Sequence, residues 1–326
     1  MRASVPEWQA AWNLYREAVE EGEMLYAAMK QEAFVSKMTC AREGVVTVNL
    51  LEKEGNAFAS GCLEKASGKL FVTMVLVRKK ARRQGMGKAL LSALESALAE
   101  EKGSGDGEIV FELSFFDPVT LSWEIPGRSG VTHPNAPGVD AGSGAYYFFK
   151  NCGYREFALQ NSYYLDLKDY ACPDAVRERK QELARDGITF QIYDGRIHQG
   201  MEEMLKKLGN AQWEREILGE PEIGAGGRPV LVPVQDQKVL GFTGPLSVEA
   251  GGRGYFAGIA ISPDARGKGL GKLLFWELCS GLQEQGAAYM TLFTGENNPA
   301  RNIYEETGFR IVRSWSDMRK GKTDER

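Results

Sequence analysis

Two short glycine-rich stretches, 184 residues apart (266 − 82), point most directly to chemistry. Arg82–Gly87 reads Arg-Arg-Gln-Gly-Met-Gly, and Arg266–Gly271 reads Arg-Gly-Lys-Gly-Leu-Gly. Each stretch follows a short apolar run and opens an amphipathic helical pattern. A strand, a glycine turn and a helix together place backbone N–H groups where they can hold a phosphate. The repetition therefore predicts a duplicated domain and a phosphate-bearing, nucleotide-like ligand.

A second pattern follows the second glycine turn. It reads Asn-x-x-Ala-x-x-x-Tyr-x-x-x-Gly-Phe, from Asn297 through Ala300 and Tyr304 to Gly308–Phe309, and Asn298 is an equal candidate for its first position. This half of the chain therefore carries a second pattern in addition to its phosphate-binding turn.

Together the two patterns resemble the GCN5-related N-acetyltransferases, the GNAT superfamily, and the resemblance covers the whole chain. It implies an α+β fold with three α/β/α layers, built as two tandem GNAT domains. Each domain would contain a mixed, mostly antiparallel sheet with a splayed central strand pair, flanked by helices. A dinucleotide-binding oxidoreductase fits less well, because Gly267-x-Gly269-x-Gly271 is not the GxGxxG spacing.

The resemblance implies acetyl-CoA as cofactor. Glycines in the turn would let backbone N–H groups approach the pyrophosphate, and Arg266 and Lys268 would add positive potential. The strand from Gly258 would pair with the pantetheine arm and present an N–H to the thioester carbonyl. In the second copy the implied cofactor-binding residues are Ile259, Ala260, Ile261, Arg266, Gly267, Lys268, Gly269, Leu270, Gly271, Lys272, Asn297 and Asn298. In the first copy they are Val75, Leu76, Val77, Arg82, Arg83, Gln84, Gly85, Met86, Gly87 and Lys88.

Tyr304 matches the position of the family's general acid, which would protonate the leaving thiolate of CoA. The alternative is that Tyr304 only packs a short helix against the sheet. Aligning Gly153–Tyr154 with Gly308–Phe309 puts Phe149 at the corresponding place in the first copy. Phenylalanine has no proton to donate, so the first half lacks the expected acid.

Other positions of the first copy also depart from the pattern. Gly142 or Ser143 replaces the asparagine, and Tyr146 and Tyr147 point about 200–300° around the helix axis from Phe149. We therefore place catalysis in the second half. The first half is expected to bind CoA, or to bind it unproductively, while serving structure or substrate selection.

The sequence gives little indication of which residue would deprotonate the amine. His133 and His198 lie outside both patterns, and a lone histidine is usually a surface residue or a satisfied one. Glu214 and Glu216 lie in the second copy where the family often lines its acceptor pocket. Either could act, and water could equally relay the proton.

The elements that must position these residues repeat in the same order in both halves. The expected domains are 1–167 and 187–326, joined by a charged connecting helix over 168–186. Helical patterns cover 6–21, 23–37, 86–102, 143–151, two segments within 195–219, 270–286 and 299–307. Strand patterns cover 44–52, 57–64, 70–77, 109–116, 153–167, 188–193, 230–234, 239–248, 254–262, 288–294 and 309–318.

Two features make the first half different. It has no counterpart of strand 188–193, so its sheet is either one strand short or completed by the other domain. It is also 29 residues longer between the glycine turn and the short helix (63 − 34), because of a proline-rich loop over about 117–144 that includes Trp123, His133, Pro134 and Asp140. A loop that long is usually functional or disordered. The loop could be a lid over a pocket or a solvated insertion, and the sequence does not favour either.

Composition limits the partners. The net charge of −4 and the absence of a basic tail argue against nucleic acid, which leaves a small-molecule or peptide amine as the expected acceptor. Five scattered cysteines without a CxxC pair suggest reduced thiols and no metal. No apolar window of about 18 residues exists, so we expect no membrane partner and a cytoplasmic monomer or homodimer. The function that competes with N-acetyl transfer is non-catalytic acyl-CoA binding or sensing.

Overall fold

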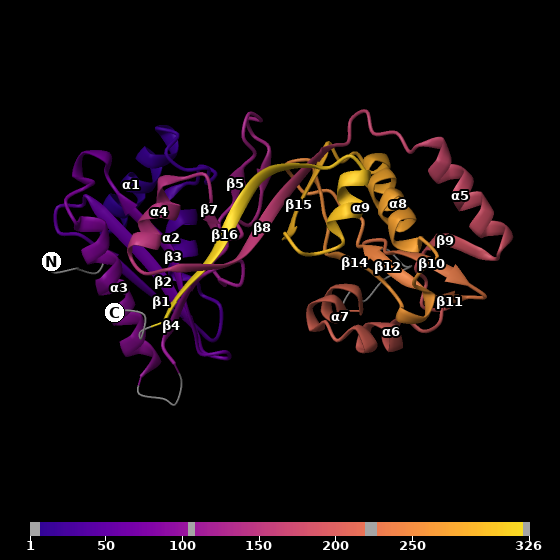
Figure 1. Cartoon of the computed structure of the whole chain (residues 1–326), viewed down its shortest axis with the longest axis horizontal. Coiled ribbons are helices and arrows are strands. Elements are labelled where there is room, and N and C mark those ends of the chain that lie inside the picture. The colour runs from indigo at the N-terminus through magenta and orange to yellow at the C-terminus, as the bar shows by residue number, and fades with distance from the viewer. Residues whose placement is uncertain (1–6, 104–107, 219–226, 322–326) are drawn as a thin grey trace. The chain divides into compact units, whose positions relative to one another are not determined.

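The computed structural model describes residues 7–103, 108–218 and 227–321 (Figure 1). Within them the chain divides into two compact units. Unit 1 consists of 7–162, 293–296 and 312–321, and unit 2 of the remaining described residues. The units are therefore not contiguous in sequence, unlike the expected domains 1–167 and 187–326. The expected helix ends at residues 6 and 219 lie outside the described residues.

Unit 1 contains four helices among the described residues, and its strands form one main sheet and one short hairpin. The helices are α1 (Trp8–Glu20), α2 (Gln31–Thr39), α3 (Met86–Lys102) and α4 (Gly144–Asn151). The strands are β1 (Val45–Leu51), β2 (Ala57–Glu64), β3 (Lys69–Val77), β4 (Val110–Leu113), β5 (Trp123–Glu124), β6 (Thr132–His133) and β7 (Val139–Asp140). Parts of β8 (Arg155–Asp166), β15 (Tyr289–Gly295) and β16 (Arg310–Gly321) also belong to this unit.

The main sheet of unit 1 has the order β1-β2-β3-β4-β16-β8, with β7 beside β16. Its β3–β4 pair is parallel, whereas β1–β2, β2–β3 and β4–β16 are antiparallel. Among the described residues β1 is the edge strand of this sheet. The sheet is therefore one strand short at this edge, and the other domain does not complete it there. The strand that the C-terminal part of the chain supplies, β16, pairs instead with β4.

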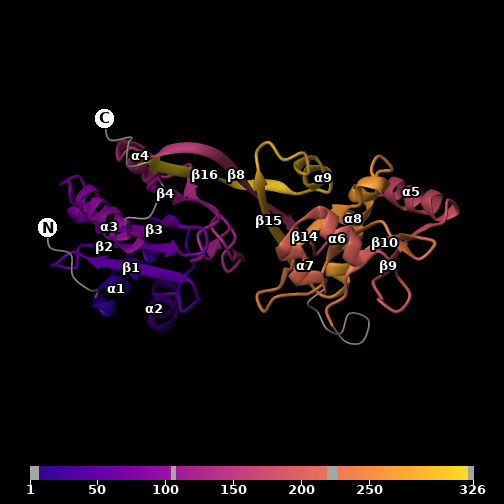
Figure 2. The ribbon, with the colours of Figure 1, turned by 90° about the horizontal axis from the view of Figure 1, so that it is seen from below.

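Helices cover both faces of this sheet because successive side chains of a strand point to opposite faces. Ala57 and Ala59 of β2 contact the cluster formed with Leu94 of α3, whereas Phe58 contacts Tyr15 of α1 and its neighbours. Figure 2 shows α3 on one side of these strands and α1 and α2 on the other. The expected three-layer arrangement is therefore confirmed in unit 1.

The insertion over 117–144 is folded and packed. Trp123 is fully buried and its indole N–H donates to the carbonyl of Asn135 at 3.1 Å, and Ile125 and His133 are also buried. The short strands β5 and β6 pair within it. A solvated insertion is therefore excluded, and the segment contributes a wall to unit 1.

Unit 2 has its own elements, again with helices on two sides of its strands. Its helices are α5 (Asp174–Arg185), α6 (Met201–Leu208), α7 (Ala211–Leu218), α8 (Leu270–Glu284) and α9 (Arg301–Glu306). Its strands, besides parts of β8, β15 and β16, are β9 (Ile188–Ile192), β10 (Leu231–Gln235), β11 (Lys238–Val239), β12 (Gly241–Gly244), β13 (Arg253–Gly254) and β14 (Gly258–Ile261).

The core of unit 2 shows the same period-two packing. Val230 and Val232 contact the cluster of α6 and α7, whereas Leu231 contacts the cluster of Leu274 and its neighbours on α8. Strands β9, β10, β12 and β14 pair antiparallel, and β13 pairs parallel with β15. The segment that we expected to be a connecting helix is α5, which packs on α8 through Val176 and other apolar residues.

Several expected bounds differ from the observed ones. The expected helix 23–37 begins only at Gln31, so 21–30 is a connection between α1 and α2. The expected strand 239–248 ends at Gly244, which precedes Pro245 and a cis peptide bond. The expected strand 254–262 is two strands, β13 and β14, separated by 255–257. All five cysteines are free, and among the described helices none is long and apolar enough to cross a membrane.

Candidate functional site

The two glycine turns have the same backbone conformation. Helix α3 begins after Gly85, which has φ +79°, and α8 begins after Gly269, which has φ +74°. Glycine fits this left-handed region without strain, because it lacks a Cβ. A Cβ built on either glycine would meet no heavy atom within 4 Å, so the turn is open on that side.

An open turn ahead of a helix is suited to an anion. The first amide groups of a helix have no acceptor within it, and the helix dipole adds positive potential there. In unit 2 Arg266 and Lys268 are exposed beside the turn. The side chain of Leu270 is buried in the core, so only the backbone of this residue could contact a ligand. Lys272 contacts Glu306 at 2.5 Å. These residues fit a diphosphate group.

The strand ahead of each turn leaves its parallel neighbour. In unit 2 β13 pairs with β15 at Gly254 and Met290, and β14 then pairs with β12 instead. In unit 1 β3 pairs with β4 as far as Phe71 and Glu112, and beyond that point its residues pair with β2. The splayed strand pair that the resemblance implied is therefore present in both units. Ile259–Ile261 lie in β14 and Val75–Val77 in β3, at the splayed ends.

Tyr304 lies beside the splay of unit 2. Its ring is 6.4 Å from that of Phe256, which lies between β13 and β14, and 5.0 Å from that of Phe275 on α8. The side chain is 6% exposed, because Phe309 and Tyr163 complete the aromatic cluster around it. The ring therefore packs the short helix α9 onto the core, and the same packing holds the phenol next to the place where the strands diverge.

Burial sets the protonation of this tyrosine. It raises the pKa of Tyr304 to about 12, and the neighbouring Tyr163 adds to the effect. The hydroxyl of Tyr163 donates to Glu305 at 3.0 Å, and burial followed by that carboxylate raises its pKa to about 12 as well. Both phenols are therefore neutral, and able to donate, throughout the physiological range.

The asparagines of the motif have separate positions. Asn298 Oδ1 accepts from the N–H of Ala300 at 3.0 Å, a local turn ahead of α9. Asn297 is exposed next to it. Both asparagines are exposed beside α9, and Asn298 additionally holds this local turn.

A second group of side chains meets the splay of unit 2 from the other side. The hydroxyl of Tyr255, directly after β13, donates to Glu216 Oε2 at 3.1 Å, and Arg228 contacts the same oxygen at 3.7 Å. Trp213 donates its indole N–H to the carbonyl of Ala257 at 3.2 Å. The structure thus brings Glu216 to the strand break. Trp213 was missed in the sequence, although it lies one residue from a candidate glutamate.

The position of the Trp213 ring requires a glycine at position 258. A Cβ on Gly258 would lie 2.4 Å from the indole nitrogen, so any other residue would displace the ring. The two histidines, in contrast, are structural. His198 accepts from the N–H of Asp194 at 2.9 Å and stacks on Tyr193, and His133 is buried among aromatic rings.

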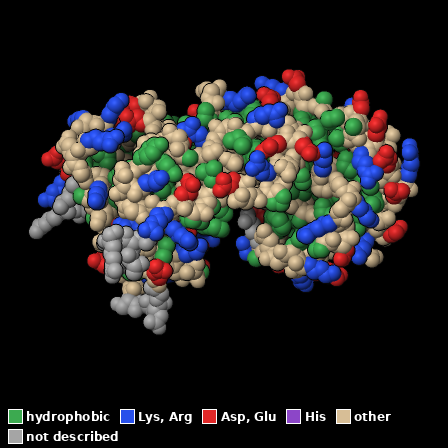
Figure 3. All heavy atoms as spheres, in the orientation of Figure 1, with side chains coloured by type: hydrophobic (Ala, Val, Ile, Leu, Met, Phe, Trp, Pro, Cys, Tyr) green, Lys and Arg blue, Asp and Glu red, His purple; other side chains and the backbone are tan. Residues whose placement is uncertain are grey.

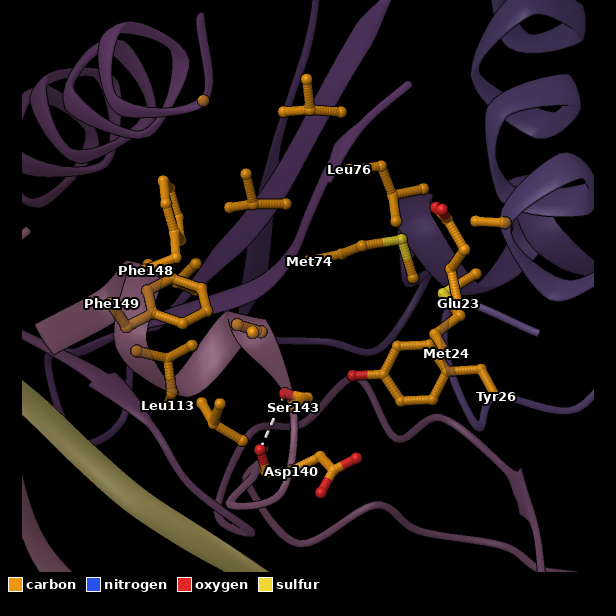
Figure 4. Close-up of a pocket in the computed structure, with 18 of the residues that line it drawn as sticks. Glu23, Met24, Tyr26, Met74, Leu76, Leu113, Asp140, Ser143, Phe148 and Phe149 are labelled. Atoms are coloured by element: carbon orange, nitrogen blue, oxygen red, sulfur yellow. Dashed lines mark hydrogen bonds between the residues drawn. The ribbon is translucent and has the colours of Figure 1, made fainter. Parts of the chain in front are cut away.

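Unit 1 holds a cavity of about 1150 Å³ against its glycine turn. Figure 4 shows Phe148 and Phe149 of α4 on one side of it, with Met24 and Tyr26 of the α1–α2 connection on the other. Arg82, Arg83, Gly85, Met86, Gly87 and Lys88 line the turn end, and Val75, Leu76 and Val77 line the wall that β3 makes. The structure therefore collects nearly all of the first-copy residues in one cavity; Gln84 instead donates to the carbonyl of Lys80 at 3.3 Å.

An acidic side chain covers the turn of unit 1. Arg82 donates to Glu23 with a short hydrogen bond, and Lys79 lies 3.7 Å from the same carboxylate. Arg82 also donates to the carbonyl of Val77 at 2.8 Å. Nothing in the sequence marked Glu23, because it comes from the irregular connection that we expected to be a helix.

Unit 1 has Phe149 at the position that corresponds to Tyr304. Phe149 is 6% exposed and packs against Tyr154 with ring centroids 5.4 Å apart. Tyr147 is exposed at the rim of the cavity. The carboxylates Asp117 and Asp140 and the phenol of Tyr26 line the cavity as well. Both aspartates lie in the loop over 117–144 that the sequence singled out, and Asp140 is among the residues named for that loop.

The charged side chains on the face of the molecule in Figure 3 are of both signs and interspersed. Among the residues that the structure describes, no group of three or more His, Cys, Asp or Glu side chains is arranged to hold a metal ion.

The site agrees with comparisons to known proteins. Residues 199–309 match the acetyltransferase (GNAT) family. A 62-residue stretch is 44% identical to the ribosomal protein bS18-alanine N-acetyltransferase of Haemophilus influenzae, and it spans 19% of this chain and 40% of that relative.

Two solved structures share the fold over nearly the whole chain. A GCN5-related N-acetyltransferase from Sphaerobacter thermophilus has a TM-score of 0.63 at 17% identity, covering 98% of this chain and 94% of that one. A tandem GNAT protein from the clavulanic acid biosynthesis pathway has a TM-score of 0.57 at 15% identity, covering 96% and 94%. Residues 199–309 therefore match an acetyltransferase (GNAT) domain, and nearly the whole chain shares the fold of these two structures.

Proposed function

We propose that this chain is an acetyl-CoA-dependent N-acetyltransferase that acts in unit 2, with Tyr304 as the general acid. One observation carries the proposal: the phenol of Tyr304 belongs to the aromatic cluster beside the splay between β14 and β15. The first copy has phenylalanine at the corresponding position. The acceptor is an amine, on a small molecule or on a peptide.

The residues of unit 2 fit the cofactor. The open turn at Gly269 and the exposed Arg266 and Lys268 would hold the diphosphate, and the free edge of β14 would hold the extended arm. Acetyl-CoA supplies an activated acetyl group, whose transfer to an amine leaves a thiolate that needs a proton. Asn297, beside α9, is a further candidate for contact with the cofactor.

Tyr304 would supply that proton. A pKa of about 12 keeps the phenol protonated at neutral pH, so it can donate its proton to the thiolate. Neutral surroundings of Phe256 and Phe275 keep water away and favour direct transfer over exchange with solvent.

The acceptor would enter where Glu216, Tyr255 and Trp213 meet the strand break. Glu216 is the better placed of the two expected glutamates, since Tyr255 and Arg228 hold it there. A carboxylate at this place can receive the proton of an ammonium directly or through water. The relative from Haemophilus influenzae is named for a protein substrate, which is why a peptide amine stays among the candidates.

The test is release of free CoA thiol from acetyl-CoA with a panel of primary amines and peptide N-termini. Tyr304→Phe should lower kcat by about 10²–10⁴-fold, because one general acid is lost and the ring is kept. Tyr163→Phe is the matched control, as it removes a neighbouring buried phenol whose hydroxyl donates to Glu305, and it should change kcat by less than about threefold. Unchanged turnover in Tyr304→Phe would rule out this acid.

The alternative function, acyl-CoA binding without transfer, has one observation in its favour in unit 1. There the cavity, the turn and the splay are all present while Phe149 cannot donate a proton. We therefore propose that unit 1 binds an acyl-CoA or a related ligand without reacting it. Absence of turnover with every amine, together with CoA binding, would extend this alternative to the whole chain.

A further inference from the structure

The cavity of unit 1 has an acidic end at a distance from its glycine turn. Asp117 and Thr73 line this end, and Thr73 precedes Val77 by four residues of β3, about 13 Å along an extended strand. Arg82 and Lys88 line the other end. The cavity therefore has positively charged side chains at the end next to the glycine turn and the carboxylate of Asp117 at the other end.

Asp117 accepts three hydrogen bonds from neutral donors. Its Oδ2 accepts from the hydroxyl of Thr73 at 2.8 Å, and its Oδ1 accepts from the N–H of Val119 at 2.8 Å. The thiol of Cys62 donates to Oδ1 at 3.4 Å. Within the part of the chain that the structure describes, these contacts orient the carboxylate without bringing a cation to it.

The other carboxylates of the cavity differ in this respect. Those that are partly buried each contact a cation: Glu17 with Arg78, Glu23 with Arg82, and Asp140 with Arg313. Glu21 is exposed to solvent. Asp117 is thus the partly buried carboxylate whose charge the described chain leaves uncompensated.

The surroundings of Asp117 favour a positively charged ligand. Burial raises the pKa of Asp117 to about 6, which shows that its charge is poorly solvated. Burial and then the charges of Asp117 and Asp140 raise the pKa of Tyr26 to about 12. A bound cation would relieve both effects, and the ring of Tyr26 offers a face on which a cation is attracted.

We propose that this end of the unit 1 cavity binds the ammonium group of a small primary amine through Asp117, with the apolar body of the amine lying along Met74, Val119 and Leu121. The carboxylate would accept charge-assisted hydrogen bonds from the ammonium. An N-acetylated amine has no charge at that nitrogen, so the site distinguishes a free amine from its acetylated form. The inference rests on unit 1 alone and does not require transfer in unit 2.

Calorimetric titration of the full chain tests the proposal, with phenethylamine and hexylamine as probes beside their N-acetyl derivatives. The amines should bind about tenfold more tightly than the N-acetyl forms. Asp117→Asn should remove that preference when both proteins carry Glu216→Gln, which takes away the carboxylate proposed to meet the acceptor in unit 2. Glu21→Gln, which removes an exposed carboxylate from the same cavity, should bind the amines like the wild type. Tyr304→Phe should bind them equally well, which separates this result from the outcome of the turnover experiment.

The wild type provides a test that does not depend on a variant. Its affinity for the amines should fall about tenfold for each pH unit below 6, as Asp117 takes up its proton. Cys62 on β2 and Tyr26 also face Asp117, and burial raises the pKa of both groups, so neither changes charge near pH 6. Asp140 is paired with Arg313. Equal affinity for amine and amide, an unchanged preference in Asp117→Asn, or no binding of any probe would overturn the proposal.

Discussion

In unit 1 the arginine of the glycine turn, Arg82, is paired with Glu23, whereas in unit 2 no carboxylate among the described residues contacts the corresponding Arg266. The backbones of the two turns are nearly the same, with φ +79° at Gly85 and +74° at Gly269. The scaffold that positions an anion is therefore kept in both units. The charge available at that scaffold differs, because an internal carboxylate already partners the cation of unit 1.

The two units differ away from their glycine turns as well. Unit 2 places the phenol of Tyr304 beside its splay, while unit 1 has Phe149 at the corresponding position and an acidic cavity end built around Asp117. Since duplication starts with two equal copies, side chains have changed where the backbone has not. Binding and transfer can then be divided between the units, and this division is what the following substitutions test.

The largest expected effect comes from adding a methyl group to each turn. Gly269→Ala should raise the KM for acetyl-CoA about tenfold, because its Cβ would stand in the open space through which a phosphate reaches the amide groups. Gly85→Ala carries the same backbone cost at φ +79° and should leave KM unchanged. Steady-state kinetics on both variants checks the comparison. An equal rise in KM for the two would show that the units contribute alike.

Removal of the carboxylate over the unit 1 turn should have a smaller and opposite effect. Glu23→Gln frees Arg82 and Lys79 for an anion, and we expect CoA to bind unit 1 about fivefold more tightly. Titration of CoA into Gly269→Ala, with and without Glu23→Gln, isolates this unit. Unchanged or weaker binding would mean that Glu23 does not compete with the ligand.

The sequence predicted the backbone features well, for reasons visible in particular residues. A glycine turn opening a helix and the Asn-Ala-Tyr-Gly-Phe spacing are local patterns, so both turns and the place of Tyr304 could be predicted. Glu23 could not, since its role depends on an irregular connection that reaches Arg82 only in the folded chain. The pairing of β16 with β4 joins residues about 200 apart, and no local pattern encodes such a contact.

Asp117 should lower the stability of unit 1 at neutral pH. Its pKa is near 3.8 in an unfolded chain and about 6 in the fold, so the folded protein binds the proton more tightly and its stability rises as pH falls from 6 to 4. Asp117→Asn removes the charge, and it should raise the free energy of unfolding at pH 7 by about 1 kcal/mol, a value discounted for partial exposure. Thermal melts between pH 4 and 8 measure this. The gain must disappear near pH 4, and a gain that is the same at every pH would point to packing instead of charge.

The smallest expected effect lies within the turns themselves, at Arg83 and Gly267. Arg83 has φ +63° where Gly267 has φ +82°, so unit 1 holds an arginine in the left-handed region that costs a residue with a Cβ roughly 1–2 kcal/mol. Arg83→Gly would relieve that cost but would also increase the freedom of the unfolded chain, by roughly 0.5–1 kcal/mol. We expect a net gain of about 0.5 kcal/mol, while Gly267→Ala should lose about 1 kcal/mol. Chemical unfolding of the two variants measures both changes. A loss of stability in Arg83→Gly would show that the Arg83 side chain makes a contribution that offsets its strained backbone.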